Sequence, residues 1–276
     1  MQRCMGSSKT SSDSHWVIKL DRVQAHYGQT RALAVERLRI GAAERTFVLG
    51  RSGSGKTTLA RLIKGRLKPT AGQVSVLGAD PASSRAHARR AIQRRIAMID
   101  QEFFLLPRMS VVGNVLSGCL ARVTPWKSLL GWYPDDEWEK AETILAEVKL
   151  DGLGQRRVET LSGGQRQRTA IARALMQEAD IILADEPISN LDPELAADAL
   201  RLLVECAERR GVTLVVNLHQ PALARQFASR LIGLAAGTVV YDGPSEGLTP
   251  EKAKLLYRAN HNDDKQIALD TAGAVR

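Results

Sequence analysis

Short apolar runs separated by glycines and polar turns predict β-strands in the first part of the chain. Residues 16–20 and 32–40 alternate loosely between apolar and polar side chains, and residues 46–49 form a short, mostly apolar run. Alternation is typical of a strand with one buried face, and a continuous run is typical of a strand buried on both faces. We therefore expect an early β-rich section that ends in a buried strand at Leu49.

Helical periodicity appears directly after this section and again in the middle of the chain. A helix is expected at 57–66, and the pattern from about 110 to 177 is largely helical. Within that region we expect amphipathic helices at 135–148 and 162–176, the second with Ser162 as its N-cap. The other expected elements are strands at 73–78, 95–99, 181–184 and 213–216, a helix at 193–210, and a hairpin of 231–234 with 238–241.

The composition is that of a soluble globular protein. Of 276 residues, 44% are hydrophobic and 25% charged, and no run approaches the ~18 consecutive apolar residues that would span a bilayer. Residues 1–14 are polar and lack the apolar segment of a signal peptide. We therefore expect any link to a membrane to come through another chain. The three cysteines (Cys4, Cys119 and Cys206) show no metal-ligand spacing, which favours ordinary thiols in a reducing compartment.

The net charge of +9 comes from 39 basic and 30 acidic residues. Basic proteins can bind nucleic acid or an anionic membrane surface. Short arginine clusters occur at 85–95 and 156–157, but no aromatic side chains interleave with them as they would in a platform for single strands. The charge is interpreted mainly as a solvated surface, with membrane proximity as a weaker alternative and nucleic-acid binding as the least favoured.

A phosphate-binding loop is predicted at residues 50–57. The sequence Gly-Arg-Ser-Gly-Ser-Gly-Lys-Thr fits the pattern GxxxxGK followed by Ser or Thr, and it lies between an expected strand and an expected helix. Glycines let backbone amides curl around an anion, and the following helix adds the positive end of its dipole. Lys56 can reach the β- and γ-phosphates, and the Thr57 hydroxyl can bind Mg²⁺. The alternative, a glycine-rich turn before a helix, does not account for the Lys-Thr pair in register.

Two adjacent carboxylates follow a buried strand. The apolar run 181–184 leads into Asp185 and Glu186, whose side chains point in opposite directions if the strand continues. The acid at the end of such a strand supports Mg²⁺ in phosphate-loop ATPases, which assigns Asp185 to the metal. Glu186 is then the candidate general base for the attacking water. The alternative for Glu186 is a cap on the turn before Pro187.

Three segments together resemble the ATP-binding subunits of ABC transporters. Residues 50–57, 161–165 and 185–186 are similar to the Walker A, signature and Walker B elements in that family's order, within a resemblance that covers roughly 16–257. It implies an α/β fold: a P-loop NTPase core of the ABC ATPase type with an antiparallel β subdomain and a helical subdomain. The implied divisions are a flexible extension at 1–14, the ATPase domain at 15–260 with its helical subdomain at about 102–178, and a polar tail at 261–276.

The resemblance also assigns roles to single residues. The catalytic residues are Glu186, His219 and Gln101, and the Mg²⁺ ligands are Thr57, Gln101 and Asp185. The implied ATP-binding residues are Tyr27, Gly50, Arg51, Ser52, Gly53, Ser54, Gly55, Lys56, Thr57, Thr58, Ser162, Gly163, Gly164, Gln165 and Asp192.

Some of these assignments have simpler alternatives, and the chain departs from the family pattern at two positions. His219 can be an ordinary surface or core histidine, and Tyr27, expected to stack on adenine, can be a packing residue. Asn190 stands where Ala is more usual in the D-loop 189–192, and Asp100 precedes Gln101 where an aromatic residue is frequent.

The partners implied by the resemblance are a second copy of this chain and membrane permease subunits. In ABC ATPases the signature turn (here Ser162-Gly163-Gly164) closes over the nucleotide held by the other subunit, so that two ATP molecules lie in a head-to-tail dimer. A solute-binding protein is an indirect partner, nucleic acid is not expected, and the expected location is peripheral, on the cytoplasmic face of the inner membrane.

The cargo is approached only by resemblance. Residues 101–116, 124–134 and 216–220 look most like the ATP-binding subunits of phosphonate importers. The alternatives are an ABC transporter for another solute, a soluble ABC ATPase not tied to transport, and an interaction module that binds nucleotide without turnover. Trp126, Trp132 and Trp138 either help to form a groove for a coupling helix of the permease or fill the core of the helical subdomain.

Overall fold

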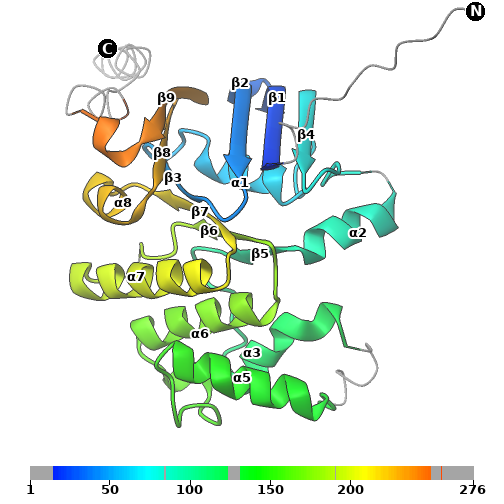
Figure 1. Ribbon diagram of the computed structural model, residues 1–276, viewed down its shortest axis with the longest axis vertical. Coiled ribbons are helices and arrows are strands. Elements are labelled where there is room, and N and C mark those ends of the chain that lie inside the picture. The colour runs from blue at the N-terminus through cyan, green and yellow to red at the C-terminus, as the bar shows by residue number, and fades with distance from the viewer. Residues whose placement is uncertain (1–14, 84, 124–130, 190, 250–255, 257–276) are drawn as a thin grey trace, which may run out of the picture.

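One nine-stranded sheet runs through the computed structural model, which describes residues 15–83, 85–123, 131–189, 191–249 and 256. The strand order is β4-β1-β2-β9-β8-β3-β7-β6-β5. The sheet thus has an antiparallel end at β4, β1 and β2. Its other end, from β8 to β5, is parallel (Figure 1).

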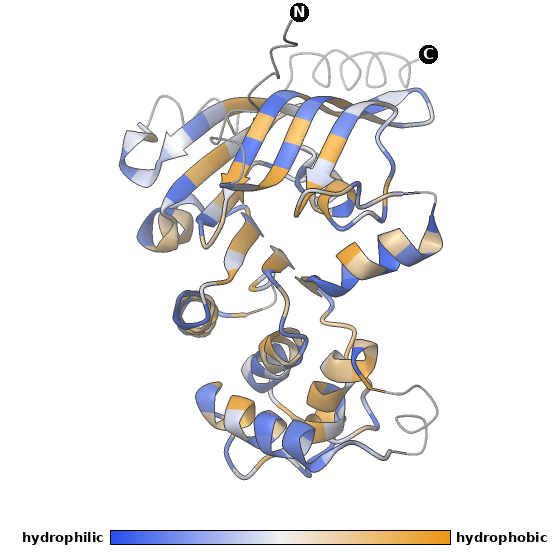
Figure 2. Cartoon of the chain, turned by 45° about the vertical axis from the view of Figure 1, so that its right-hand side comes forward, coloured by the Kyte–Doolittle hydropathy of each residue, from blue (hydrophilic) through white to orange (hydrophobic). Residues whose placement is uncertain are grey.

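The antiparallel end consists of β1 (Trp16–Tyr27), β2 (Thr30–Gly41) and β4 (Ala71–Val76). Buried apolar positions alternate with polar ones along these strands, which Figure 2 shows as bands of opposite hydropathy. Such alternation buries one face and leaves the other to solvent. The buried face packs against α1 (Lys56–Ile63) in one of the two hydrophobic clusters.

The parallel end holds β8 (Arg230–Ala235), β3 (Arg45–Leu49), β7 (Thr213–Leu218), β6 (Ile181–Asp185) and β5 (Ile96–Ile99). Their short runs are buried almost throughout, as expected for parallel strands covered on both faces. β9 (Thr238–Pro244) returns antiparallel to β8. The helices at this end are α2 (Ala86–Arg94), α7 (Pro193–Arg209) and α8 (Pro221–Phe227).

A separate helical layer lies on the far side of the parallel strands from β1, β2 and β4 (Figure 1). It contains α3 (Val111–Leu116), α5 (Asp135–Glu147), α6 (Gly163–Met176) and the 3-10 turns η1 (Ser117–Ala121) and η2 (Val158–Thr160). A last 3-10 turn, η3 (Ser245–Gly247), follows β9. In the part of the chain described, none of the helices is both long and apolar enough to cross a membrane.

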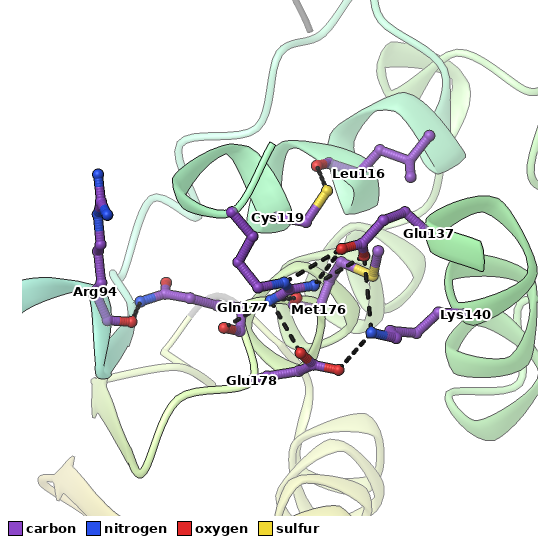
Figure 3. Close-up of polar contacts among 9 residues, drawn as sticks. Arg94, Leu116, Cys119, Glu137, Lys140, Met176, Gln177 and Glu178 are labelled. Atoms are coloured by element: carbon purple, nitrogen blue, oxygen red, sulfur yellow. Dashed lines mark hydrogen bonds and ion pairs between the residues drawn. The ribbon is translucent and has the colours of Figure 1, made fainter. Parts of the chain in front are cut away.

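The carboxyl end of α6 is the joint between this layer and the sheet. Gln177 Nε2 donates to the carbonyls of Arg94 and Ile96, at distances of 2.7 Å and 2.9 Å, which ties the helix end to the start of β5. On the other side, Arg122 Nη1 donates to the carbonyls of Met176 and Gln177 (Figure 3). These bonds satisfy carbonyls that a helix end leaves without an intrahelical partner.

The elements expected from the sequence are largely those observed, with differences at their ends. The fold class is confirmed, including the antiparallel and helical parts and the 231–241 hairpin. The first strand is longer than expected and ends at Tyr27, and the helix expected at 57–66 ends at Ile63. The helices α2 and α8 were not predicted; α2 has a single buried residue, Ile92, so its pattern carries little apolar signal.

Candidate functional site

The phosphate loop and the predicted catalytic residues lie at one edge of the sheet. The parallel strands β3, β7, β6 and β5 end at Leu49, Leu218, Asp185 and Ile99, respectively. Ligands of open α/β sheets bind beyond the carboxyl ends of parallel strands. The phosphate loop, Glu186, His219 and Gln101 follow these ends in the chain, so the fold brings them to the same edge.

Two glycines of the loop occupy positions where a side chain does not fit. A Cβ on Gly50 would lie 2.4 Å from the Leu234 carbonyl oxygen and from Ser54 Oγ. Gly55, with φ of 104°, precedes α1, and a Cβ there would lie 2.7 Å from the Ala32 carbonyl oxygen. Glycine is therefore required both by the backbone conformation at 55 and by the close approach of neighbouring strands.

The interior of the loop offers polar groups to a ligand. Ser54 Oγ is buried and has no hydrogen-bond partner among the described residues. The first turn of α1 begins at Lys56, and a helix start presents N–H groups without intrahelical partners. A buried hydroxyl and free amides around a glycine cradle fit an anion such as a phosphate.

The Lys56 ammonium lies inside this loop and is almost completely buried. Its Nζ donates to the carbonyls of Gly50, at 2.8 Å, and Arg51, at 3.0 Å, and lies 3.3 Å from Glu186 Oε1. A buried ammonium needs such partners because desolvation without them is costly. The loop thus holds one positive charge at its centre, in contact with the candidate general base.

The two carboxylates have different surroundings. Asp185 is buried at the end of β6, and its Oδ1 accepts a hydrogen bond from Asn217 Nδ2 at 2.8 Å. Glu186 is more exposed, with its Oε2 3.6 Å from His219 Nδ1. Its φ of 49° is in the left-handed region, which costs a residue with a side chain roughly 1–2 kcal/mol. Because the backbone turns at Glu186, the carboxylates of Asp185 and Glu186 have different partners.

Gln101 follows β5 and is exposed. It lines a pocket of about 330 Å³ together with Phe103, Gly163, Arg166 and Leu191. Asp100, the unusual neighbour noted in the sequence, pairs with Arg66 at 3.3 Å. The segment after β5 therefore lies between the sheet and the start of α6.

The signature turn is built as a helix start. Ser162 caps α6 by accepting from the Gln165 amide, and Gln165 Oε1 accepts from the Ser162 amide in return. This reciprocal pair is a capping box, and it confirms Ser162 as the N-cap. In the described part of the chain, no hydrogen bond or ion pair joins 162–165 to the loop at 50–58.

The remaining residues predicted from the sequence lie at the ends of helices and strands or in the phosphate loop. Tyr27 ends β1 and is 45% exposed; its hydroxyl accepts from Arg61 Nη1 at 3.2 Å, which links the ring to α1. Asp192 caps α7 by accepting from the Leu195 amide at 3.1 Å. Arg51, Ser52, Gly53 and Thr57 are exposed at the loop, whereas Thr58 is buried. Asn190 and Trp126 lie outside the described residues.

The other two tryptophans of the middle region differ from each other. Trp132 is 62% exposed. Trp138 packs on the helical core and meets Tyr133 edge to face, with ring centroids 6.4 Å apart. Trp138 thus fits the expectation of a core residue, and Trp132 alone offers an exposed ring among the described tryptophans of this region.

Sequence reasoning missed Asn217 and Arg61 as parts of this site. Asn217 is the carboxamide within a fully buried strand, and that break in an apolar run was the signal available. Arg61 carries no such signal because it is an exposed residue on a helix.

The donor set fits Mg²⁺ shared with phosphates. The candidate ligands Thr57, Gln101 and Asp185 offer hydroxyl, amide and carboxylate oxygens, which are the hard donors that Mg²⁺ prefers. Among the described residues, no group of three or more His, Cys, Asp and Glu side chains could hold a metal by itself. Mg²⁺ is commonly bound by one or two carboxylates together with substrate phosphates, so one aspartate suffices.

Comparison with known sequences places these segments in a wider context. A sequence model described as ABC transporter matches residues 35–189. A phosphonates import ATP-binding protein, PhnC 1 of Rhodopseudomonas palustris (strain HaA2), is 41% identical over 82% of this chain and 81% of its own length. The phosphonates import ATP-binding protein PhnC of Alcaligenes faecalis is 37% identical over 88% of both chains.

Solved structures agree in fold. CbiO1 from Clostridium perfringens, part of the ABC transporter complex cbiONQ, superposes with a TM-score of 0.76 over 87% of this chain and 93% of its own, at 24% identity. A dimeric ATP-binding cassette in a post-hydrolysis state, bound to ADP and Pi, gives a TM-score of 0.69 at 31% identity. That match covers 83% of this chain and 99% of the cassette.

Proposed function

This chain belongs to the ABC transporter family, and from that premise we propose that it is the ATP-hydrolysing subunit of an importer that takes up phosphonates or related phosphorus oxyanions. The observation that carries the ATPase is the meeting of the phosphate loop, Asp185-Glu186 and His219 at one sheet edge. The cargo rests on the names of relatives about 40% identical over most of the chain, such as PhnC 1.

In the proposed mechanism the phosphate loop binds the triphosphate. Backbone amides at 50–58 and the start of α1 surround the β- and γ-phosphates, and Lys56 neutralises part of their charge. Tyr27, steadied by Arg61, stacks on the adenine. Because Lys56 also lies 3.3 Å from Glu186, the base is held close to the γ-phosphate position.

Mg²⁺ would be held by Thr57, Gln101 and Asp185, and when bound it supplies charge neutralisation to the phosphates. Glu186 orients the attacking water and takes its proton. His219, 3.6 Å from Glu186, would hydrogen-bond the γ-phosphate and keep the carboxylate in position.

The signature turn is proposed to act on the nucleotide of a second copy of this chain. Its lack of bonds to its own phosphate loop, together with the free amides at the start of α6, supports a two-chain sandwich. The ATP-binding cassette in a post-hydrolysis state, bound to ADP and Pi, has a dimeric structure. ATP then bridges the two subunits, and hydrolysis removes that bridge.

For the permease we propose a basic groove between α2, η1 and the end of α6. Its volume is about 410 Å³, and its lining includes Lys64, Arg66, Arg90 and Arg94. No hydrogen bond or ion pair among the described residues engages the side chains of Arg90 and Arg94, which are four residues apart on one helix face. A groove with this charge fits an acidic segment of a membrane subunit. The protein would then lie peripherally, on the cytoplasmic face of the membrane.

The test of the catalytic assignment is Glu186→Gln. We expect hydrolysis to fall by at least about 100-fold because the general base is lost. ATP binding should persist, so that ATP-bound dimers accumulate and can be measured by size-exclusion chromatography with light scattering. Glu142→Gln, the same change at an exposed position of α5, is the matched control and should leave the rate unchanged.

Hydrolysis at the parental rate in Glu186→Gln would refute the assigned base. The cargo is tested separately, by growth of a host lacking this gene on a phosphonate as the sole phosphorus source. Restoration by the wild-type gene and not by the Glu186→Gln gene would support the proposal, and unimpaired growth of the deletion strain would exclude this cargo.

A further inference from the structure

A carboxamide lies inside β7, a strand whose six residues are all buried. Asn217 is 2% exposed, with apolar neighbours Val216 and Leu218 on either side. Burial of an amide is unfavourable unless its polar atoms are hydrogen-bonded. The Asn217 side chain therefore requires a polar partner within the sheet.

Its side chain meets Asp185. β7 lies between β3 and β6, and the parallel register sets Asn217 opposite Asp185 on one side and Val48 on the other. Paired residues of neighbouring strands project to the same face of a sheet. Accordingly, Nδ2 donates to Asp185 Oδ1 at 2.8 Å, between two side chains that are both buried.

Its backbone meets the other acid. The Glu186 amide donates to the Asn217 carbonyl at 3.1 Å, at the residue where the chain turns into the left-handed region. A residue in that conformation persists only when its surroundings fix it. One residue of β7 therefore contacts both members of the acid pair, through its side chain and through its main chain.

We propose that Asn217 is a positioning residue for the Mg-ATP site. By donating to Oδ1 it fixes the rotation of the Asp185 carboxylate, and no hydrogen bond among the described residues engages Oδ2, which is left for the metal or its water. The proposal rests on the role of Asp185 given under Proposed function. In many metal sites a neighbouring residue orients the ligand by a hydrogen bond, and the proposal assigns that role to Asn217.

The experiment separates metal positioning from a structural role. Asn217→Leu and Asn217→Ser both remove the bond to Asp185, the first with a branched apolar side chain and the second with a shorter polar one. Binding of a fluorescent ATP analogue is measured in EDTA and across a Mg²⁺ titration, and ATPase rates are measured over the same titration. Thermal unfolding is recorded for every variant.

We expect the Mg²⁺ concentration for half-maximal binding and activity to rise about 10-fold or more in both variants. Affinity for the analogue in EDTA should stay within about twofold of wild type, since no hydrogen bond among the described residues joins the Asn217 side chain to the phosphate loop. Thr213→Val is the matched control, because it removes a buried hydrogen-bonding hydroxyl from the other end of β7. It should lower the unfolding temperature and leave the Mg²⁺ dependence unchanged.

An unchanged Mg²⁺ dependence in the folded Ser variant would overturn the proposal, and so would equal losses of affinity with and without Mg²⁺. If wild-type protein neither bound ATP nor required Mg²⁺, the proposed function would fail instead. That result is distinct, because it appears before any variant is compared.

Discussion

Two lysines at opposite ends of α1 have different surroundings. Lys56, at the start of the helix, contacts Glu186 and two carbonyls of the phosphate loop. Lys64, just past its end, donates to the carbonyls of Gln93 and Ile96, and no carboxylate among the described residues hydrogen-bonds it. Burial, together with the charge of Arg66, lowers the pKa of Lys64 to about 8, and the charge of Asp100 opposes both.

This depressed pKa predicts a pH-dependent stability. The unfolded chain keeps Lys64 protonated up to a pKa near 10.5, so between pH 8 and 10.5 it binds more protons than the folded chain. The wild type should therefore gain stability relative to Lys64→Met as the pH rises through that window. Below pH 8 the difference between the two proteins should be constant. Urea unfolding at pH 7, 8, 9 and 9.5 measures it, and a difference that stayed flat across the range would contradict the shift.

At the scale of elements, α6 is anchored at its carboxyl end and begins at the turn proposed to contact the nucleotide of a second subunit. Its first turn carries the signature residues, and its last residues are tied to β5 by Gln177 and to η1 by Arg122 (Figure 3). Arg122 also pairs with Glu137 of α5 at 2.8 Å, and Glu178 pairs with Lys140 at 2.6 Å. The helix spans 14 residues, about 20 Å, so a small rotation at this joint moves the signature turn by several ångströms.

Removing the arginine should loosen this joint. Arg122→Met leaves the buried Glu137 with Lys140, 3.9 Å away, as its remaining ion-pair partner among the described residues, and we expect a loss of about 1–3 kcal/mol in the free energy of unfolding. Arg201→Met, which removes an exposed pair with Asp198, is the control and should cost less than about 1 kcal/mol.

The double variant Arg122→Met with Glu137→Leu decides the cause. If the loss comes from an unpaired buried carboxylate, the double variant should be more stable than Arg122→Met alone. Equal or lower stability would show that lost packing or lost carbonyl bonds dominate instead. Chemical denaturation followed by circular dichroism supplies all four values.

For the whole molecule, two surfaces compete as the proposed contact with a permease. The basic groove combines Arg90, Arg94 and Arg66 in one place, whereas Trp132 is a single exposed ring in the helical layer. Charge complementarity can discriminate between partners more sharply than one apolar contact. We therefore place the docking site in the groove.

Charge reversal tests this choice. Arg90→Glu with Arg94→Glu should abolish co-purification with the permease while leaving the ATPase activity of the isolated subunit within about twofold, because no hydrogen bond or ion pair in the described part of the chain joins either side chain to the phosphate loop. Trp132→Ala should retain assembly. The reverse outcome, assembly lost only in Trp132→Ala, would restore the tryptophan groove as the contact. High salt should weaken the wild-type complex because salt screens the attraction between the arginines of the groove and an acidic partner.

Local sequence patterns were enough to predict many of the strands and helices. The strands at 46–49, 181–184 and 213–216 were predicted because parallel strands buried on both faces leave continuous apolar runs. Ser162 was predicted as a cap because its role depends on residues within one turn. By contrast, α2 buries a single side chain, Ile92, and the pairing of Arg122 with Glu137 joins separate elements, so neither left a readable pattern of apolar residues.

The sequence by itself determined the identity of the loop at 50–57, the acid pair at 185–186 and the family, since each depends on residue types at fixed spacing along the chain. Only the tertiary structure decided what surrounds them: Glu186 beside Lys56, Asn217 against Asp185, and the groove lined by arginines. The first two contacts follow from strand order and register, which join residues more than 30 positions apart, and no local pattern of side chains encodes which strand will lie next to which.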